Sequence, residues 1–232
     1  MTAVGLLADR QRGTTMPLLV TRNDWRELLP KAPPGVIDAF DANATVLGAA
    51  GITDTKTRFA FALANVDHEC DGFQIRNLIE NINYSAERLA EVFPSRYASA
   101  DEVRARHGTA PGWQKLAFDE IYGNRMGNRP GTTDGSTYIG RGGPQITGRD
   151  GYDQVGQRCQ LNLVANPDLA SLPQNQPAIL AAFWTWKKLN TFADNGDFVG
   201  CVRAWNGGTI GLPDRNARMA RHKPIIDRLA MN

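Results

Sequence analysis

Residues 58–80 read RFAFALANVDHECDGFQIRNLIE, and this stretch decides how the rest of the chain is interpreted. Its apolar side chains recur at the helical spacing i, i+3, i+4 and i+7, at Phe59, Ala62, Leu63 and Val66. That spacing predicts an amphipathic helix with one apolar face. Glu69 falls at the edge of this face, in the last turn, and Asp71-Gly72 predicts the end of the helix.

Glu69 has surroundings that suit a catalytic acid. Apolar neighbours and the negative end of a helix dipole both disfavour the ionised form of a carboxylate, and a general acid has to hold its proton near neutral pH. Glu80 stands eleven residues farther on, at the end of a second apolar run. Two carboxylates on opposite sides of a turn are the minimum equipment for hydrolysing a glycosidic bond. The alternative that these residues leave open is a pair of ordinary surface acids.

The composition is that of an ordinary globular protein. Of the 232 residues, 42% are hydrophobic and 22% are charged, which suits one domain with a hydrophobic core. The formal net charge is only +2, so bulk electrostatics indicates no nucleic-acid partner. Residues 1–16 lack clear periodicity and are interpreted as an N-terminal arm, and the domain is predicted to span residues 17–232.

Positive charge collects at the C-terminal end. Residues 203–232 contain six Lys/Arg against Asp214 and Asp227. A basic end of this kind either attracts an anionic bacterial wall or is the solvated face of a helix. The helix face is the simpler interpretation.

The cysteines indicate the compartment in which the chain is made. Cys70, Cys159 and Cys201 are an odd number without CxxC spacing, which argues against a disulfide framework and for a reducing compartment. No paired ligand spacing joins them to the histidines, so we expect no metal and no other cofactor. The apolar run of residues 4–8 is too short for a signal peptide, and no segment approaches a membrane span, so no stable membrane insertion is expected.

A glycine-rich stretch follows the middle of the chain. Residues 127–144 read GNRPGTTDGSTYIGRGGP, and Tyr138-Ile139 between glycines predicts a small hairpin. Gln145 and Thr147 would then alternate on a strand and offer an amide and a hydroxyl to a sugar or a water molecule, while the glycines let the backbone approach the sugar. The alternative is a structural loop.

Two more stretches complete the candidate site. Residues 178–189 read AILAAFWTWKKL, and aromatics at this helical spacing are interpreted as core rather than as sugar-stacking surfaces. Asn206-Gly207-Gly208 is typical of a helix end with a left-handed glycine. Arg215 is either a cleft arginine or an exposed residue at a helix start.

These motifs together resemble glycoside hydrolase family 19, which contains plant-type chitinases and phage endolysins. The resemblance spans roughly residues 17–225 and rests on these segments: HECDGF (68–73), ENINYSAERL (80–89), VFPSRY (92–97), YIGRGGPQITGRDGY (138–152) and Asn206-Gly207-Gly208 with the following GL and DR. It implies a mainly α, lysozyme-like, two-lobed helical domain with a small β-hairpin lining the cleft.

The resemblance also implies roles for single residues in an inverting reaction. Glu69 would be the general acid, Glu80 the general base, and Thr147 the residue that helps to hold the attacking water. The positions that match the family's substrate-binding residues are His68, Tyr84, Gln145, Asn206 and Arg215. Two departures matter: Cys70-Asp71 replaces Ser/Thr-Gly and places an extra carboxylate beside the acid, and a longer segment before Glu80 leaves Glu87 as the alternative base.

The substrate is not decided by these residues, because chitin and peptidoglycan share a β-1,4-linked aminosugar backbone. The absence of a signal peptide and of paired cysteines favours an endolysin that acts on peptidoglycan, held in the host bacterial cytoplasm until it is released to the cell wall. We expect a monomer. The alternatives are a chitinase, a lytic transglycosylase, which needs one glutamate and no water, and a catalytically inactive wall-binding protein.

Overall fold

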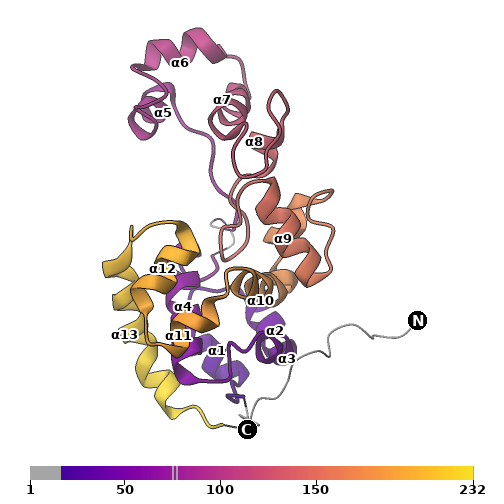
Figure 1. Ribbon diagram of the computed structural model, residues 1–232, viewed down its shortest axis with the longest axis vertical. Coiled ribbons are helices and arrows are strands. Elements are labelled where there is room, and N and C mark those ends of the chain that lie inside the picture. The colour runs from indigo at the N-terminus through magenta and orange to yellow at the C-terminus, as the bar shows by residue number, and fades with distance from the viewer. Residues whose placement is uncertain (1–16, 75, 77, 232) are drawn as a thin grey trace, which may run out of the picture.

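The computed structural model describes residues 17–74, 76 and 78–231, which form two helical lobes (Figure 1). The upper lobe is made of α5 (Ala86–Val92), α6 (Ala100–His107), α7 (Trp113–Tyr122) and α8 (Asp134–Thr137). The larger lower lobe is made of α1 (Arg22–Leu28), α2 (Pro34–Ala42), α3 (Ala44–Ala49), α4 (Lys56–Cys70), α9 (Arg149–Cys159), the 3-10 turns η2 (Pro167–Ser171) and η3 (Pro173–Asn175), α10 (Gln176–Trp186), α11 (Leu189–Asp194), α12 (Phe198–Asn206) and α13 (Leu212–Arg228).

Each lobe has its own hydrophobic core. The smaller cluster, around Leu89 and Phe118, holds the upper lobe together. The larger cluster runs from Leu18 to Leu229 through the lower lobe. The mainly α, two-lobed fold class is thus confirmed. The predicted arm at residues 1–16 lies outside the described residues, and among the described helices none is both long and apolar enough to cross a membrane.

The helix predicted from the opening stretch is α4, and it lies at the centre of the lower lobe. Thr55 caps its start by accepting a hydrogen bond from the Arg58 N–H at 3.1 Å. The four apolar residues of its predicted face are buried: Phe59, Ala62, Leu63 and Val66. Asp71 ends the helix in the left-handed conformation, with φ of 48°, followed by Gly72 with φ of 76°.

Four of the six basic residues at the C-terminal end are exposed, as expected of a solvated face, but α13 also packs along α4 and pairs with its acids. Arg215 contacts Glu69, and Arg218 contacts Asp67, with 2.7 Å between Nη1 and Oδ1. Arg221 also pairs with Asp67. The arginines of α13 therefore anchor the helix that carries the candidate acid.

The sequence pattern also predicts helices over residues 36–48, 113–126 and 192–205, with Leu116 facing inward, and the structure shortens or divides each of them. The helix expected over 36–48 is divided into α2 and α3 at Asn43, which has a non-helical backbone. The helix expected over 113–126 ends at Tyr122, before Gly123, and Leu116 is exposed rather than inward-facing. The helix expected over 192–205 is interrupted by Gly196, whose φ is 68°. Hydrophobic periodicity continues across each break, so it cannot locate the break.

The predicted hairpin is a tight turn without extended strands. Arg141 and Ile146 exchange two backbone hydrogen bonds, of 3.1 and 2.9 Å, and a further isolated bridge joins Arg141 to Ile79. Gln145 therefore lies in a turn with φ of 56°, not on a strand. The Arg141 side chain fixes this turn from within, because it is buried and donates to the Thr137 carbonyl (2.7 Å) and to the Tyr152 hydroxyl (2.9 Å).

Two of the glycines in this turn serve protein packing rather than approach to a sugar. A Cβ at Gly143 would lie 2.4 Å from the Phe73 ring, and one at Gly142 would lie 2.7 Å from the Ala170 carbonyl oxygen. Neither distance is compatible with a side chain unless neighbours move. The glycines let the turn sit directly against the core of the lower lobe.

Candidate active site

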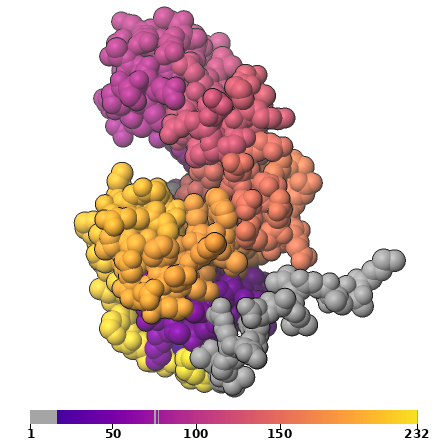
Figure 2. All heavy atoms as spheres, in the orientation of Figure 1, coloured from indigo at the N-terminus to yellow at the C-terminus, as the bar shows by residue number. Residues whose placement is uncertain are grey.

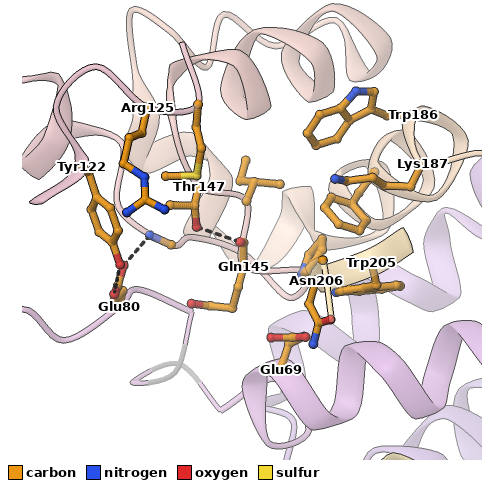
Figure 3. Close-up of a pocket in the computed structure, with 16 residues that line it drawn as sticks. Glu69, Glu80, Tyr122, Arg125, Gln145, Thr147, Trp186, Lys187, Trp205 and Asn206 are labelled. Atoms are coloured by element: carbon orange, nitrogen blue, oxygen red, sulfur yellow. Dashed lines mark hydrogen bonds between the residues drawn. The ribbon is translucent and has the colours of Figure 1, made fainter. Parts of the chain in front are cut away.

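A cavity of about 630 Å³ opens between the two lobes, where Figure 2 shows the surface hollowed beside the C-terminal region. Its walls come from segments that are far apart in the sequence. They are Glu69, Glu80, Tyr122, Arg125, Met126, Gly140, Pro144, Gln145, Ile146, Thr147, Phe183, Trp186, Lys187, Trp205, Asn206 and Gly207. All three residues predicted to be catalytic, Glu69, Glu80 and Thr147, are among them, as Figure 3 shows.

Glu69 enters the cavity from the last turn of α4 and is held from below by a buried arginine. Its carboxylate accepts a hydrogen bond from Nη2 of Arg215. The Arg215 side chain is only 1% exposed, and its Nη1 also donates to the Asn65 Oδ1 at 2.7 Å. This contact fixes the direction of the Glu69 carboxylate and provides a fixed positive charge beside it.

Glu80 reaches the cavity from an extended segment that runs beside the tight turn. Its backbone N–H donates to the Gly140 carbonyl at 2.8 Å, and its Oε2 accepts from the Gly140 N–H at 2.9 Å. The Tyr122 hydroxyl lies 3.5 Å from Oε1. Burial and the charge of Glu80 raise the pKa of Tyr122, so its phenol stays protonated and remains a donor. In Figure 3, Glu69 and Glu80 occupy different sides of the cavity, with Gln145 between them.

Thr147 and Gln145 present polar groups in the same cavity. The Thr147 Oγ1 donates to the Gln145 carbonyl at 3.1 Å, which leaves its lone pairs available to a water molecule. The Gln145 amide is held by the Gly142 carbonyl at 3.0 Å. Although the strand predicted for these residues is absent, both side chains line the predicted cleft.

Asn206 is the remaining predicted site residue that lines the cavity. It closes α12, and Gly207 follows in the left-handed conformation with φ of 82°, as expected for a helix end. Its Oδ1 accepts from the Gly208 N–H at 3.0 Å, so the side chain is oriented by its own loop.

Four other sequence candidates lie outside the cavity lining. His68 contacts Asp214, with 2.6 Å between Nδ1 and Oδ2. Tyr84 packs its ring against Phe118 in the upper lobe. Arg215 is buried behind Glu69 instead of being exposed to a ligand.

Glu87, the fourth, pairs with Arg104 on the outer surface of α5. Of the two candidate bases, Glu80 lines the cavity and Glu87 does not. The extra carboxylate of Asp71 is also engaged elsewhere, since Lys31 Nζ lies 2.7 Å from its Oδ1 and Arg218 is a second partner. Both contacts lower the pKa of Asp71.

Several lining residues were not among the sequence candidates. Trp186, Trp205 and Phe183 form an aromatic wall of the cavity. The core interpretation is correct for Phe183 and Trp184, which are buried, whereas Trp186 is only partly buried. Lys187, beside Trp186, and Arg125 also line the cavity. One signal in the sequence could have predicted that this helix end meets a surface. Lys187 directly follows a run of aromatic residues, and a charged side chain seldom ends inside a core.

The arrangement suits acid–base chemistry on a polymer with ring-shaped units. Two carboxylates approach one cavity from separate elements, a hydroxyl and amides lie between them, and aromatic rings form a wall. Within the described part of the chain, no group of His, Cys, Asp or Glu side chains could hold a metal ion. Fold and cavity together define the class of two-lobed helical proteins with an acid-lined cleft.

Comparison with known proteins identifies the family. The chain is 31% identical over 206 residues to a glycosyl hydrolase family 19 domain-containing protein of Haemophilus influenzae, covering 86% of this chain and 94% of that protein. The chain therefore belongs to glycosyl hydrolase family 19, whose members hydrolyse glycosidic bonds. No family model matches the chain.

Solved structures show the same fold. Chitinase C of Streptomyces griseus is similar with a TM-score of 0.55 and 19% identity, over 90% of this chain and 92% of that one. A bacterial family 19 chitinase is similar with a TM-score of 0.52 and 20% identity, over 89% of this chain and 94% of that one.

Proposed function

We propose that this family 19 hydrolase is an endolysin, a muramidase-type peptidoglycan hydrolase that cleaves β-1,4 bonds between aminosugars with inversion and serves bacterial lysis. The observation that carries the proposal is the pair of carboxylates, Glu69 on α4 and Glu80 on the extended segment beside the tight turn, which line one cavity from different sides. Two unrelated surface acids would have no reason to line the same cavity. The two acids match the equipment of an inverting glycosidase.

The proposed reaction assigns one proton transfer to each carboxylate. Glu69 donates its proton to the glycosidic oxygen as the bond to the anomeric carbon breaks. Glu80 removes a proton from a water molecule whose oxygen attacks that carbon from the opposite face. Glu69 ends ionised and Glu80 protonated. Inversion requires a carboxyl separation of roughly 6.5–9.5 Å, which leaves room for the water.

The surrounding groups support this assignment. Arg215 stabilises the negative charge that Glu69 acquires when it gives up its proton. The Gly140 N–H and the Tyr122 hydroxyl hold the Glu80 carboxylate, and the Thr147 oxygen is available to accept the second hydrogen of the water. Gln145, Asn206 and the aromatic wall are proposed to bind the sugar rings.

Peptidoglycan is preferred over chitin on two observations. Cys159 and Cys201 are free thiols, which suits a protein held in the bacterial cytoplasm until lysis rather than a secreted chitinase. One arginine and one lysine side chain, Arg125 and Lys187, also line the cavity, and chitin carries no negative charge that could pair with them. Chitin is nevertheless the second candidate, since both structural relatives named above are chitinases.

Product analysis tests the proposal. Purified peptidoglycan is digested by the wild type, by Glu69→Gln, by Glu80→Gln and by the matched variant Glu87→Gln, and the fragments are separated by mass. We expect muropeptides with new free reducing ends, a loss of at least about a thousandfold in rate for the first two variants, and near wild-type rates for Glu87→Gln.

Other outcomes would replace the proposal. Anhydro-sugar products together with an active Glu80→Gln would mean a lytic transglycosylase, which needs no base and no water. Cleavage of chitin oligomers without any release from peptidoglycan would mean a chitinase. Wall binding without any products, unchanged in Glu69→Gln, would mean an inactive binding protein.

A further inference from the structure

Two positively charged side chains face the cavity from opposite sides. Arg125 follows the end of α7 in the upper lobe, and Lys187 follows the end of α10 in the lower lobe. In Figure 3, Arg125 stands near Tyr122 and Glu80, while Lys187 stands with Trp186 across the cavity. A ligand lying between the carboxylates therefore passes between two cations.

Neither cation has a carboxylate partner among residues 17–74, 76 and 78–231. This distinguishes them from the arginines of α13, of which Arg215 and Arg218 are paired with acids. The ion pairs of Arg215 and Arg218 join α13 to α4. The charges of Arg125 and Lys187 are instead available to a ligand.

Lys187 is the more constrained of the two. Its Nζ lies 4.2 Å from the centre of the Trp186 ring and 5.7 Å from that of Phe183, so the lysine is held against the aromatic wall. The Lys187 side chain is also partly buried, and this burial lowers its pKa. A desolvated cation without an anionic partner is unfavourable unless a ligand supplies the anion.

The chemistry of the two candidate substrates differs in this respect. Chitin consists of neutral N-acetylglucosamine, whereas the glycan of peptidoglycan carries short peptides with free carboxylates. We propose that Arg125 and Lys187 bind these peptide carboxylates and so select peptidoglycan over a neutral aminosugar polymer. This inference rests on the proposed function and deepens it.

The test changes only the charge of the substrate. Purified peptidoglycan is divided, and in one half the carboxylates are converted to neutral amides with a carbodiimide and ammonia. The initial rate of appearance of reducing ends is measured on both halves, and the ratio of native to amidated rates is the selectivity. For the wild type we expect a selectivity of roughly tenfold, the combined effect of two partly solvated ion pairs.

The variants assign that selectivity to residues. Arg125→Gln/Lys187→Met should lower the ratio to about one, and Arg125→Gln alone, at an exposed residue, to about threefold. The control is Arg96→Gln/Lys188→Met, which removes two exposed positive charges that do not line the cavity. Both double variants lower the formal net charge of +2 equally, so a general attraction to the wall would affect them equally. The control should keep the wild-type ratio.

Three results would overturn the inference while leaving the proposed function intact. They are a wild-type ratio near one with active hydrolysis, a ratio unchanged in Arg125→Gln/Lys187→Met, and an equal loss of the ratio in the control. A wild type that releases nothing from either half but cleaves chitin oligomers would instead refute the proposed function, and the inference with it.

Discussion

The two sides of the cavity hold their carboxylates by different means. Glu69 sits on a long buried helix, and its partner is the side chain of Arg215 from a helix distant in the sequence. Glu80 sits on an extended segment, and its partners are the backbone of Gly140 and the hydroxyl of Tyr122. The proposed acid, Glu69, is thus fixed by a buried charge, and the proposed base, Glu80, by main-chain hydrogen bonds around a turn.

This difference predicts which substitutions lower the free energy of unfolding and which lower the catalytic rate. Buried ion pairs that lose one partner leave an uncompensated charge, so the Glu69 side should be sensitive in its folding free energy. The turn beside Glu80 also contains a buried charge, Arg141, but Glu80 itself is held by the backbone of Gly140, so changes at Gly140 should alter geometry more than stability. The predictions below test this contrast.

The largest effect is expected for Arg215→Met. The substitution leaves the Glu69 carboxylate and the Asn65 amide oxygen without their buried donor, and should lower the free energy of unfolding by about 3 kcal/mol. Urea unfolding measures this loss. Arg203→Met, at an exposed residue of α12, is the control and should stay within about 0.5 kcal/mol of the wild type. Equal stability of the two variants would contradict the role of buried charge on the Glu69 side.

A smaller effect, dependent on pH, is expected for Asp67→Asn on the same side. Burial alone would raise the pKa of Asp67, but the hydrogen bond with His222 and the charges of Arg218 and Arg221 lower it below the ordinary 3.8. The ionised form is therefore stabilised by folding. That contribution is fully present above about pH 4 and is lost as the pH falls through the lowered pKa.

At pH 7 the Asp67→Asn variant should be less stable by about 2 kcal/mol, because hydrogen bonds to charged groups are weakened. The difference from wild type should shrink as the pH is lowered below about 4. Urea unfolding at a series of pH values measures it, with Asp41→Asn, at an exposed residue of α2, as the control. A difference that stays constant down to the lowest pH would show that the Asp67 charge does not stabilise the fold.

On the other side, Gly140→Ala should affect activity more than stability. A Cβ there would lie 2.7 Å from the Gln145 Oε1, so the Gln145 side chain has to shift, and 3.4 Å from Glu80 side-chain atoms, which is close to them. We expect a rate roughly tenfold lower, since small displacements of reacting groups are costly. The change in unfolding free energy should stay within about 1 kcal/mol because the Gln145 side chain is flexible.

Gly35→Ala is the matched control for Gly140→Ala. A Cβ at Gly35 would lie 3.7 Å from Pro173, an ordinary contact far from the cavity lining. It should leave the rate near that of the wild type. A loss of stability in Gly140→Ala as large as that in Arg215→Met would remove the contrast between the two sides.

The sequence predicted the helix that carries Glu69 because its signals are local, whereas the two-lobed fold followed from the family resemblance. Helical periodicity and the break at Asp71-Gly72 lie within a few residues of the features that they predict. The placement of Glu80 followed from a resemblance in sequence, and the structure brings Glu80, rather than Glu87, to the cavity.

What the sequence missed depends on contacts between distant segments. The role of Arg215 behind Glu69 could not be read from either helix alone, since 146 residues separate the pair. The strand predicted through Gln145 and Thr147 was wrong because the hairpin shrinks to a tight turn, closed by the Arg141–Ile146 pair and held from within by the buried Arg141. Trp186 reaches the cavity only because α10 ends there, and periodicity does not reveal which end of a buried helix meets a cleft.

The smallest effect is expected for Tyr122→Phe, compared directly with Tyr84→Phe. Both rings pack against Phe118 in the upper lobe, and phenylalanine keeps that packing, so each variant should stay within about 0.5 kcal/mol of wild-type stability. Of the two, it is the Tyr122 hydroxyl that bonds Glu80, and its 3.5 Å distance indicates a weak hydrogen bond. We expect Tyr122→Phe to lower the rate of hydrolysis by roughly threefold.

Comparing these two variants tests which tyrosine acts at the site, the one indicated by the family resemblance or the one that lines the cavity. The family resemblance assigns substrate binding to Tyr84, whereas the structure places Tyr122, not Tyr84, in the cavity lining. Steady-state rates on peptidoglycan fragments measure both variants. A loss confined to Tyr122→Phe follows from the cavity as described, because of the two tyrosines it is Tyr122 whose hydroxyl bonds Glu80. A larger loss in Tyr84→Phe would mean that the glycan extends along the upper lobe beyond the lining residues, and that the resemblance located this contact better than the cavity does.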